Sequence, residues 1–142
     1  MSSIDPIFAA LLRHSVRPTA MRRAVLGILS QSPYALSGTE IEQQLPLGSD
    51  RITLYRTLRT FEEKGLAHRV IDPSETVRYA VCREALHATD AAANHVHFKC
   101  TACQHTFCLS HVTVPPVAVP ARYQAVRGDY LISGICERCQ PA

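Results

Sequence analysis

The first 66 residues carry apolar side chains at helical spacing, interrupted by residues that begin or end helices. The fourth such segment is the clearest, because Leu54, Leu58 and Phe61 recur at i, i+4 and i+7 and would bury a single face. A short turn with Gly48 precedes it, which is typical of a helix-turn-helix pair. The predicted helices begin after Asp5, Thr19, Ser37 and either Ser49 or Asp50, and Ser37 with Glu40 forms a capping-box sequence.

After Gly65 the helical spacing gives way to strand-like alternation. Residues 67–71 and 77–81 alternate, and Asp72, Pro73 and Ser74 separate them, which predicts a hairpin. Helices followed by a hairpin predict a winged helix over residues 1–81. A hinge over residues 82–94 and a smaller unit over residues 95–142 complete the predicted organisation, so the fold class is α+β.

Arginines gather where a winged helix would meet DNA. The net charge of +3 is weak evidence for a polyanionic partner, but residues 13–23 contain four Arg and no acid, and the fourth helix exposes further Arg. Guanidinium groups, a hydroxyl and an aromatic ring occupy its first two turns, where a recognition helix contacts base edges and phosphates. The alternative is a solvated helix face. The predicted DNA contacts are Arg17, Arg22, Arg51, Thr53, Tyr55, Arg56 and Arg59.

All six cysteines follow residue 81, in a sequence without a basic leader or an 18-residue apolar stretch. We therefore expect neither a secretory signal nor a membrane span, and metal binding rather than disulfides. Two CxxC pairs, with 32 residues between the inner cysteines, can place four thiolates around one structural zinc ion. Redox chemistry is the alternative, although it needs only one pair. The predicted ligands are Cys100, Cys103, Cys136 and Cys139.

A second metal site is predicted around two histidines in a strand-like run. His95 and His97 lie at i and i+2, so both imidazoles would project from one face and could bind one ion. Cys108 in the next run and Cys82 at the hinge could add thiolates. A buried thiol or a solvent-facing histidine is the alternative for each residue. Imidazole and thiolate ligands favour zinc over iron or manganese, which gives about two zinc ions per chain.

Four segments together resemble the ferric uptake regulator family of bacterial metal-dependent repressors. They are RPTAMR at residues 17–22, TLYRTLRTFE at 53–62, HVHFKCTAC at 95–103 and ICERC at 135–139. The resemblance implies a cytoplasmic homodimer with an N-terminal winged helix and a small zinc-stabilised α/β dimerisation domain. It also implies that Tyr55 and Arg56 read the operator and that the two CxxC pairs hold the structural zinc. Zinc uptake regulators are the most similar branch.

The sequence departs from the family pattern in three places. Asn94, Val96 and Gly128 replace ligands of an additional metal site, which we therefore expect to be absent. Ala35 and Ala80 stand where a hinge His and Glu would be expected, which leaves Cys82 as the candidate substitute. Prolines in residues 112–120 exclude the regular dimerisation helix, so we expect the strands around residues 123–135 to form the dimer.

The sequence thus predicts a zinc-responsive repressor that binds a palindromic double-stranded operator as a homodimer, without a small-molecule substrate or a membrane. Alternatives are an iron- or peroxide-responsive repressor of the same family, a thiol switch using Cys82 and Cys108, and a zinc-stabilised RNA-binding adaptor. An enzyme is not expected, because no HExxH motif or comparable glutamate lies beside the histidine pair.

Overall fold

The computed structural model of the 142-residue chain describes residues 5–71, 74–81, 96–109, 112, 115–126, 128 and 130–141. The helices are α1 (Pro6–Arg13), α2 (Ala20–Gln31), α3 (Gly38–Gln44) and α4 (Arg51–Glu63). The strands are β1 (Leu36–Ser37), β2 (His68–Ile71), β3 (Val77–Ala80), β4 (Val96–Cys100), β5 (Thr106–Leu109) and β6 (Tyr130–Gly134). They form an α+β fold.

The helices begin where their capping residues predict. Asp5 accepts a hydrogen bond from the Ile7 N–H at 3.0 Å, and Thr19 accepts from the Arg22 N–H at 3.2 Å. Ser37 and Glu40 form the reciprocal capping box of α3. Asp50, rather than Ser49, caps α4, where it accepts from the Ile52 N–H at 3.1 Å. Side-chain acceptors at these positions satisfy amide donors that the first helical turn leaves unpaired.

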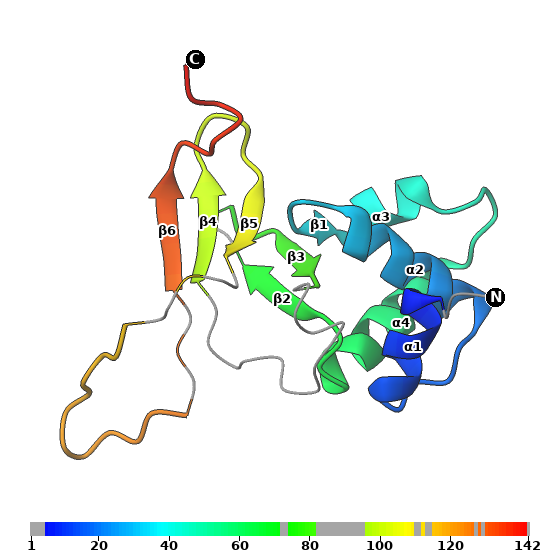
Figure 1. The fold of residues 1–142 in the computed structure, drawn as a ribbon, viewed down its shortest axis with the longest axis horizontal. Coiled ribbons are helices and arrows are strands. Elements are labelled where there is room, and N and C mark those ends of the chain that lie inside the picture. Colours follow the sequence, from blue (N-terminus) through cyan, green and yellow to red (C-terminus); the bar gives the residue numbers. More distant parts are fainter. Residues whose placement is uncertain are drawn as a thin grey trace.

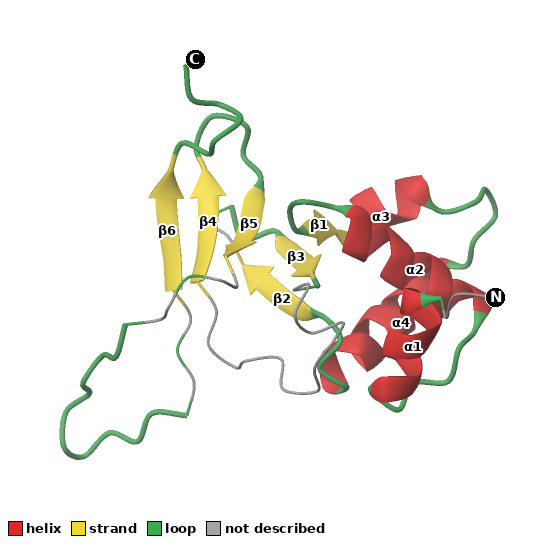
Figure 2. Ribbon diagram, viewed as in Figure 1, coloured by secondary structure: helices red, strands yellow, loops and turns green. Residues whose placement is uncertain are grey.

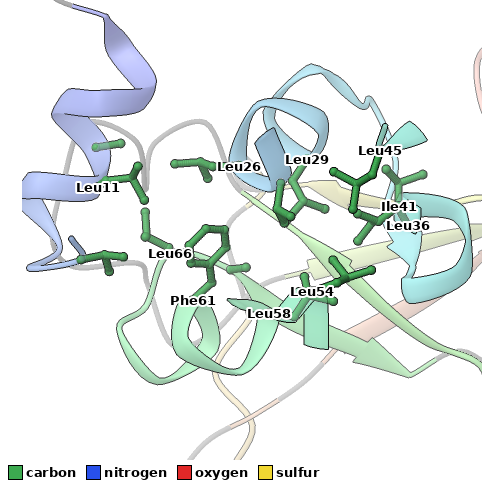
Figure 3. Packing of buried hydrophobic residues seen from close by; sticks show 14 residues of the cluster. Leu11, Leu26, Leu29, Leu36, Ile41, Leu45, Leu54, Leu58, Phe61 and Leu66 are labelled. Atoms are coloured by element: carbon green, nitrogen blue, oxygen red, sulfur yellow. The ribbon is translucent and has the colours of Figure 1, made fainter. Parts of the chain in front are cut away.

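The four helices pack around one apolar core, shown in Figure 3. Leu54, Leu58 and Phe61 are fully buried, as their spacing on α4 predicts. The spacing of Ile7, Phe8, Leu11 and Leu12 predicts an apolar stripe on α1, but only part of it is inward, because Leu11 is buried whereas Phe8 and Leu12 are exposed. The core thus fixes α4 with one face inward and its arginine-bearing faces outward.

The predicted wing hairpin is present and gains a third strand. In this sheet, of order β1-β3-β2, β3 pairs antiparallel with both neighbours, and Leu36 lies opposite Tyr79. The two-residue strand β1 immediately precedes α3 and was not predicted. Arg78 of β3 forms an ion pair with Glu40, the capping-box residue of α3. The wing is therefore attached to the helix-turn-helix by both strand pairing and charge.

Several interactions compete to set the charge of Glu40. Burial opposes its ionisation, but hydrogen bonds from Ser37 and the guanidinium of Arg78 outweigh this effect and lower the pKa of the carboxyl group. Glu40 therefore carries the negative charge that both the Arg78 ion pair and the first turn of α3 favour.

The C-terminal half forms a second sheet of order β5-β4-β6. β4 pairs antiparallel with β5, with His97 opposite Cys108, and parallel with β6. The described residues between 112 and 126 contain no helix, in agreement with the effect expected of their prolines. Of the segment 123–135, which we expected to supply strands, only Tyr130–Gly134 is a strand among its described residues.

The wing lies between the helices and the C-terminal sheet (Figure 1). Figure 2 shows the helices gathered on one side and β4, β5 and β6 on the other. A backbone hydrogen bond of 2.7 Å from the Ala35 N–H to the Thr106 carbonyl joins the two halves directly. Within the described part of the chain, no helix combines the length and apolarity that crossing a bilayer requires.

Candidate metal centres and nucleic-acid interface

The two CxxC pairs meet at one end of the C-terminal sheet. Cys100 ends β4, Cys103 lies in the following turn, and Cys136 and Cys139 occupy a second turn just after β6. The four sulfur atoms all lie within 4.8 Å of one another, and Cys103 Sγ is 3.9 Å from Cys136 Sγ. Thiolates bound to a tetrahedral zinc ion at about 2.3 Å would be about 3.8 Å apart. The four cysteines, called the four-cysteine cluster below, therefore have the spacing of a tetrahedral metal site.

Backbone donors prepare this cluster for thiolate ligands. The N–H groups of Cys103 and Cys136 each donate to Cys100 Sγ at 3.4 Å, and these bonds lower the pKa of that thiol to about 6. A hydrogen bond with the Cys136 thiol, followed by burial, raises the pKa of Cys139 to about 12. The Cys100 thiolate therefore forms readily, whereas Cys139 keeps its proton. A bound cation would favour the thiolate form of Cys139 as well.

A second group of potential ligands joins the wing to the C-terminal sheet. It comprises His68 of β2, His97 of β4 and Cys108 of β5, whose ligand atoms lie within 4.8 Å of one another. The Nε2 atoms of His68 and His97 are 3.1 Å apart, close to the spacing of about 3.3 Å for two imidazoles on a tetrahedral zinc ion. His97 is buried and the other two are half-buried. We call these three residues the junction cluster.

The structure brings together two of the four ligands that we predicted for the second site. His97 and Cys108 are cross-strand neighbours in the junction cluster. Cys82 and His95 lie outside the described residues, so their roles stay predictions. Val96 is buried and Phe98 half-buried on the strand face opposite His97.

Sequence reasoning missed His68. Two alanines replace the hinge residues expected of the family, which favours Cys82 as the ligand on the DNA-binding side. The available signal was strand alternation, since His68 lies on the same face of β2 as the buried Val70. The His68 imidazole thus lies on the face of the wing that meets the C-terminal sheet, where it reaches His97.

The predicted DNA contacts fall into two groups. Arg17, Arg22, Thr53 and Arg56 line a groove between the start of α2 and the first turns of α4. Arg22 Nη1 donates to the Arg17 carbonyl at 2.9 Å, which fixes its guanidinium at the groove. Arg56 forms no ion pair within the described residues. This groove therefore presents three cations to an anionic ligand, whereas the Thr53 hydroxyl donates to Asp50 at 2.6 Å.

The other predicted contacts have partners within the protein. Arg51 pairs with Glu42 at 3.1 Å, and Arg59 pairs with Glu63 at 3.3 Å. The two arginine pairs are exposed, so DNA phosphates can compete with them.

Tyr55 lies against the start of α3. A methyl group at Gly38 would come within 2.5 Å of the Tyr55 hydroxyl oxygen, so only glycine fits beneath this ring as it is placed. Tyr55 as a whole remains 43% exposed. Tyr55 of α4 can therefore contact both the start of α3 and an external ligand.

Solved structures share this fold across nearly the whole chain. The Helicobacter pylori ferric uptake regulator aligns with a TM-score of 0.60 and 16% identity over 100% of this chain and 99% of that chain. Holo XcZur aligns with a TM-score of 0.66 and 16% identity over 92% and 91% of the two chains. A zinc uptake regulator in complex with zinc and DNA aligns with a TM-score of 0.63 and 19% identity over 91% of this chain and 87% of that chain. No curated protein sequence matches the chain.

The sequence match is more decisive than these structural similarities, whose identities support only a common fold. A family model described as the ferric uptake regulator family matches residues 13–117, about three quarters of the chain. It covers α2 to α4, the wing and the strands that carry both histidines of the junction cluster. The chain therefore belongs to the ferric uptake regulator family of metal-responsive transcription regulators.

Proposed function

We propose that this regulator is a zinc-responsive repressor whose junction cluster controls DNA binding. One observation carries the proposal: His68 belongs to the wing, whereas His97 and Cys108 belong to the C-terminal sheet, and their ligand atoms converge. An ion held by all three would cross-link the two units. The four-cysteine cluster lies wholly within the C-terminal half, so we assign it a structural zinc ion.

The donor atoms favour zinc at the junction cluster. Two imidazole nitrogens and one thiolate match the ligands of Zn²⁺, whereas iron and manganese sensors need more oxygen ligands. Among the described residues the cluster contains no carboxylate. Cys82 and His95 are our candidates for completing the coordination. Iron or manganese at the junction cluster is the alternative. Metal analysis of the purified protein distinguishes these metals from zinc.

The proposed mechanism is a shift between orientations of the DNA-binding unit. His68 moves with the wing, and the wing is attached to α3 through β1 and the Glu40–Arg78 ion pair. Bringing His68 to His97 and Cys108 therefore also orients the recognition helix α4. A ligand can favour this orientation only by binding it more tightly, and such coupling is typically about 1 to 3 kcal/mol. By reciprocity, bound DNA should raise the affinity of the junction cluster for zinc by the same factor.

We further propose that two copies bind a palindromic duplex in the cytoplasm. Family membership supports this arrangement, and the neighbour solved with zinc and DNA is a protein of the same fold. In a symmetric dimer, two α4 helices would enter successive major grooves about 34 Å apart. Exposed apolar residues of the C-terminal half, including Leu131, Ile132 and Ile135, are available for dimerisation.

The groove arginines provide the test of DNA reading. The probe is a duplex selected by the zinc-loaded protein from a pool of random duplexes, called the selected duplex below. Arg56→Ala should weaken binding by about 1 to 3 kcal/mol and relax sequence preference if its guanidinium contacts a base. Arg22→Ala should weaken binding to all sequences alike and reduce the salt dependence by about one unit of slope.

Arg122→Ala is the matched control, because Arg122 is an exposed arginine in the connection between β5 and β6, outside the groove. Its affinity and salt dependence should equal those of the wild type. Normal binding by both Arg56→Ala and Arg22→Ala in a gel-shift series would refute the groove as the DNA interface.

A further inference from the structure

A second contact between the two units involves no residue of either the four-cysteine cluster or the junction cluster. The rings of Tyr34 and His105 stack with centroids 3.7 Å apart and an interplanar angle of 7°. The Phe107 ring meets Tyr34 edge-on at 6.1 Å and 83°. Next to the stack, the buried Ala35 N–H donates to the carbonyl of the buried Thr106 at 2.7 Å. The loop before β1 is thereby held against the start of β5.

Tyr34 is fixed to the DNA-binding unit. The Ser32 hydroxyl donates to the Tyr34 carbonyl at 2.6 Å and accepts from its N–H at 3.3 Å, forming a tight turn after α2. Ala35 then leads directly into β1 and the capping box of α3. The position of the Tyr34 ring therefore reports the position of the helix-turn-helix.

His105 is fixed to the four-cysteine cluster. The Cys100 N–H donates to the His105 carbonyl at 3.0 Å, and the Gln104 N–H donates to the Cys100 carbonyl at 2.9 Å. Gln104 has φ +66°, so the chain reverses tightly between Cys103 and His105. The turn that presents two of the cysteines thus also presents the His105 ring to Tyr34.

The same strand connects this contact to the junction cluster. Thr106 opens β5, and Cys108 follows two residues later, about 7 Å along an extended strand. Both contacts therefore bring the DNA-binding unit against β5 and its neighbour β4.

We infer that Tyr34 and His105 are positioning residues that set the zinc concentration at which the regulator responds. This inference rests on the proposed function. Their stacking favours the orientation in which His68 meets His97 and Cys108, before any ion binds there. Without the stack, a smaller fraction of chains has the junction cluster assembled. The apparent zinc affinity falls in proportion to that fraction. Once zinc saturates the cluster, the same orientation is restored and DNA affinity returns.

The test is a zinc titration of binding to the selected duplex, with the four-cysteine cluster kept loaded. Tyr34→Ala should move the midpoint to about threefold to tenfold higher free zinc, the range expected for losing one aromatic pair. Its affinity at saturating zinc should stay within about twofold of the wild type. Tyr34→Phe keeps the ring and should keep the wild-type midpoint.

Two further measurements separate positioning from general damage. In a His105→Ala background, Tyr34→Ala should cause a smaller shift than in the wild type, because the stacked pair is already lost and only the edge contact with Phe107 remains to be removed. Amide exchange of Ala35, whose N–H bonds to Thr106, should accelerate in Tyr34→Ala.

Two results would overturn the inference while leaving the proposed function intact. One is an unchanged Tyr34→Ala midpoint beside a normal wild-type response. The other is an equal loss of affinity at low and saturating zinc. A flat wild-type titration would instead contradict the proposed function itself.

Discussion

Replacing Cys100 by serine is expected to abolish metal binding at the four-cysteine cluster and to unfold the C-terminal sheet. Cys100 is fully buried, and its sulfur accepts two backbone hydrogen bonds that serine would alter. None of the described C-terminal residues belongs to the clusters of buried hydrophobic residues, which lie around the helices and the wing. A structural zinc ion contributes on the order of 10 kcal/mol, comparable to the whole stability of a small domain.

Metal analysis and circular dichroism check this expectation. Cys100→Ser should lose one tightly bound ion per chain together with β-sheet signal, while the helical signal of the first half remains. Cys108→Ser is the matched control, since Cys108 is a strand cysteine outside the four-cysteine cluster and should leave the tight ion in place. A Cys100→Ser protein with native sheet content and thermal stability would show that the cluster is not structural.

Replacing His68 by alanine is expected to remove the metal response and spare the fold. His68 lies half-buried at the start of β2, and its Nε2 atom is 3.1 Å from that of His97. Losing it leaves the junction cluster without its ligand from the wing, so zinc could no longer hold the wing to the sheet. The zinc dependence of binding to the selected duplex should fall from the coupling range of about 5- to 150-fold toward none.

Arg69→Ala is the control for this variant. Arg69 is the next residue of the same strand, projects to the opposite face and pairs with Glu62 instead of facing the C-terminal sheet. It should bind two zinc ions per chain, whereas His68→Ala should bind one. An unchanged second zinc affinity in His68→Ala, measured by competition with a chelating dye, would remove His68 from the site.

The helical half was predictable because its signals are local. Each capping side chain accepts a hydrogen bond from an N–H group only two or three residues further along the chain, as Asp5, Thr19, Ser37 and Asp50 do. Local patterns failed where tertiary contacts decide. Phe8 lies on the predicted apolar stripe but is exposed, with Arg23 5.7 Å above its ring. β1 is too short to show alternation and exists through its pairing with β3.

The two candidate metal centres differ in the same respect. The four-cysteine cluster could be predicted because each CxxC pair occupies one tight turn and two pairs complete a tetrahedron. The junction cluster draws on three strands, and its ligand from the wing is a single histidine without a motif. The pairing of His97 with Cys108 follows from adjacent strands, whereas the approach of His68 depends on how the two units meet.

The most direct test removes the junction ion alone. Mild chelation should leave one ion per chain on the four-cysteine cluster, as verified by metal analysis, and affinity for the selected duplex is then compared before and after zinc is restored. We predict binding about 5- to 150-fold weaker without the second ion, recovered fully on adding zinc. Equal affinity in the two states would contradict control of DNA binding by His68, His97 and Cys108.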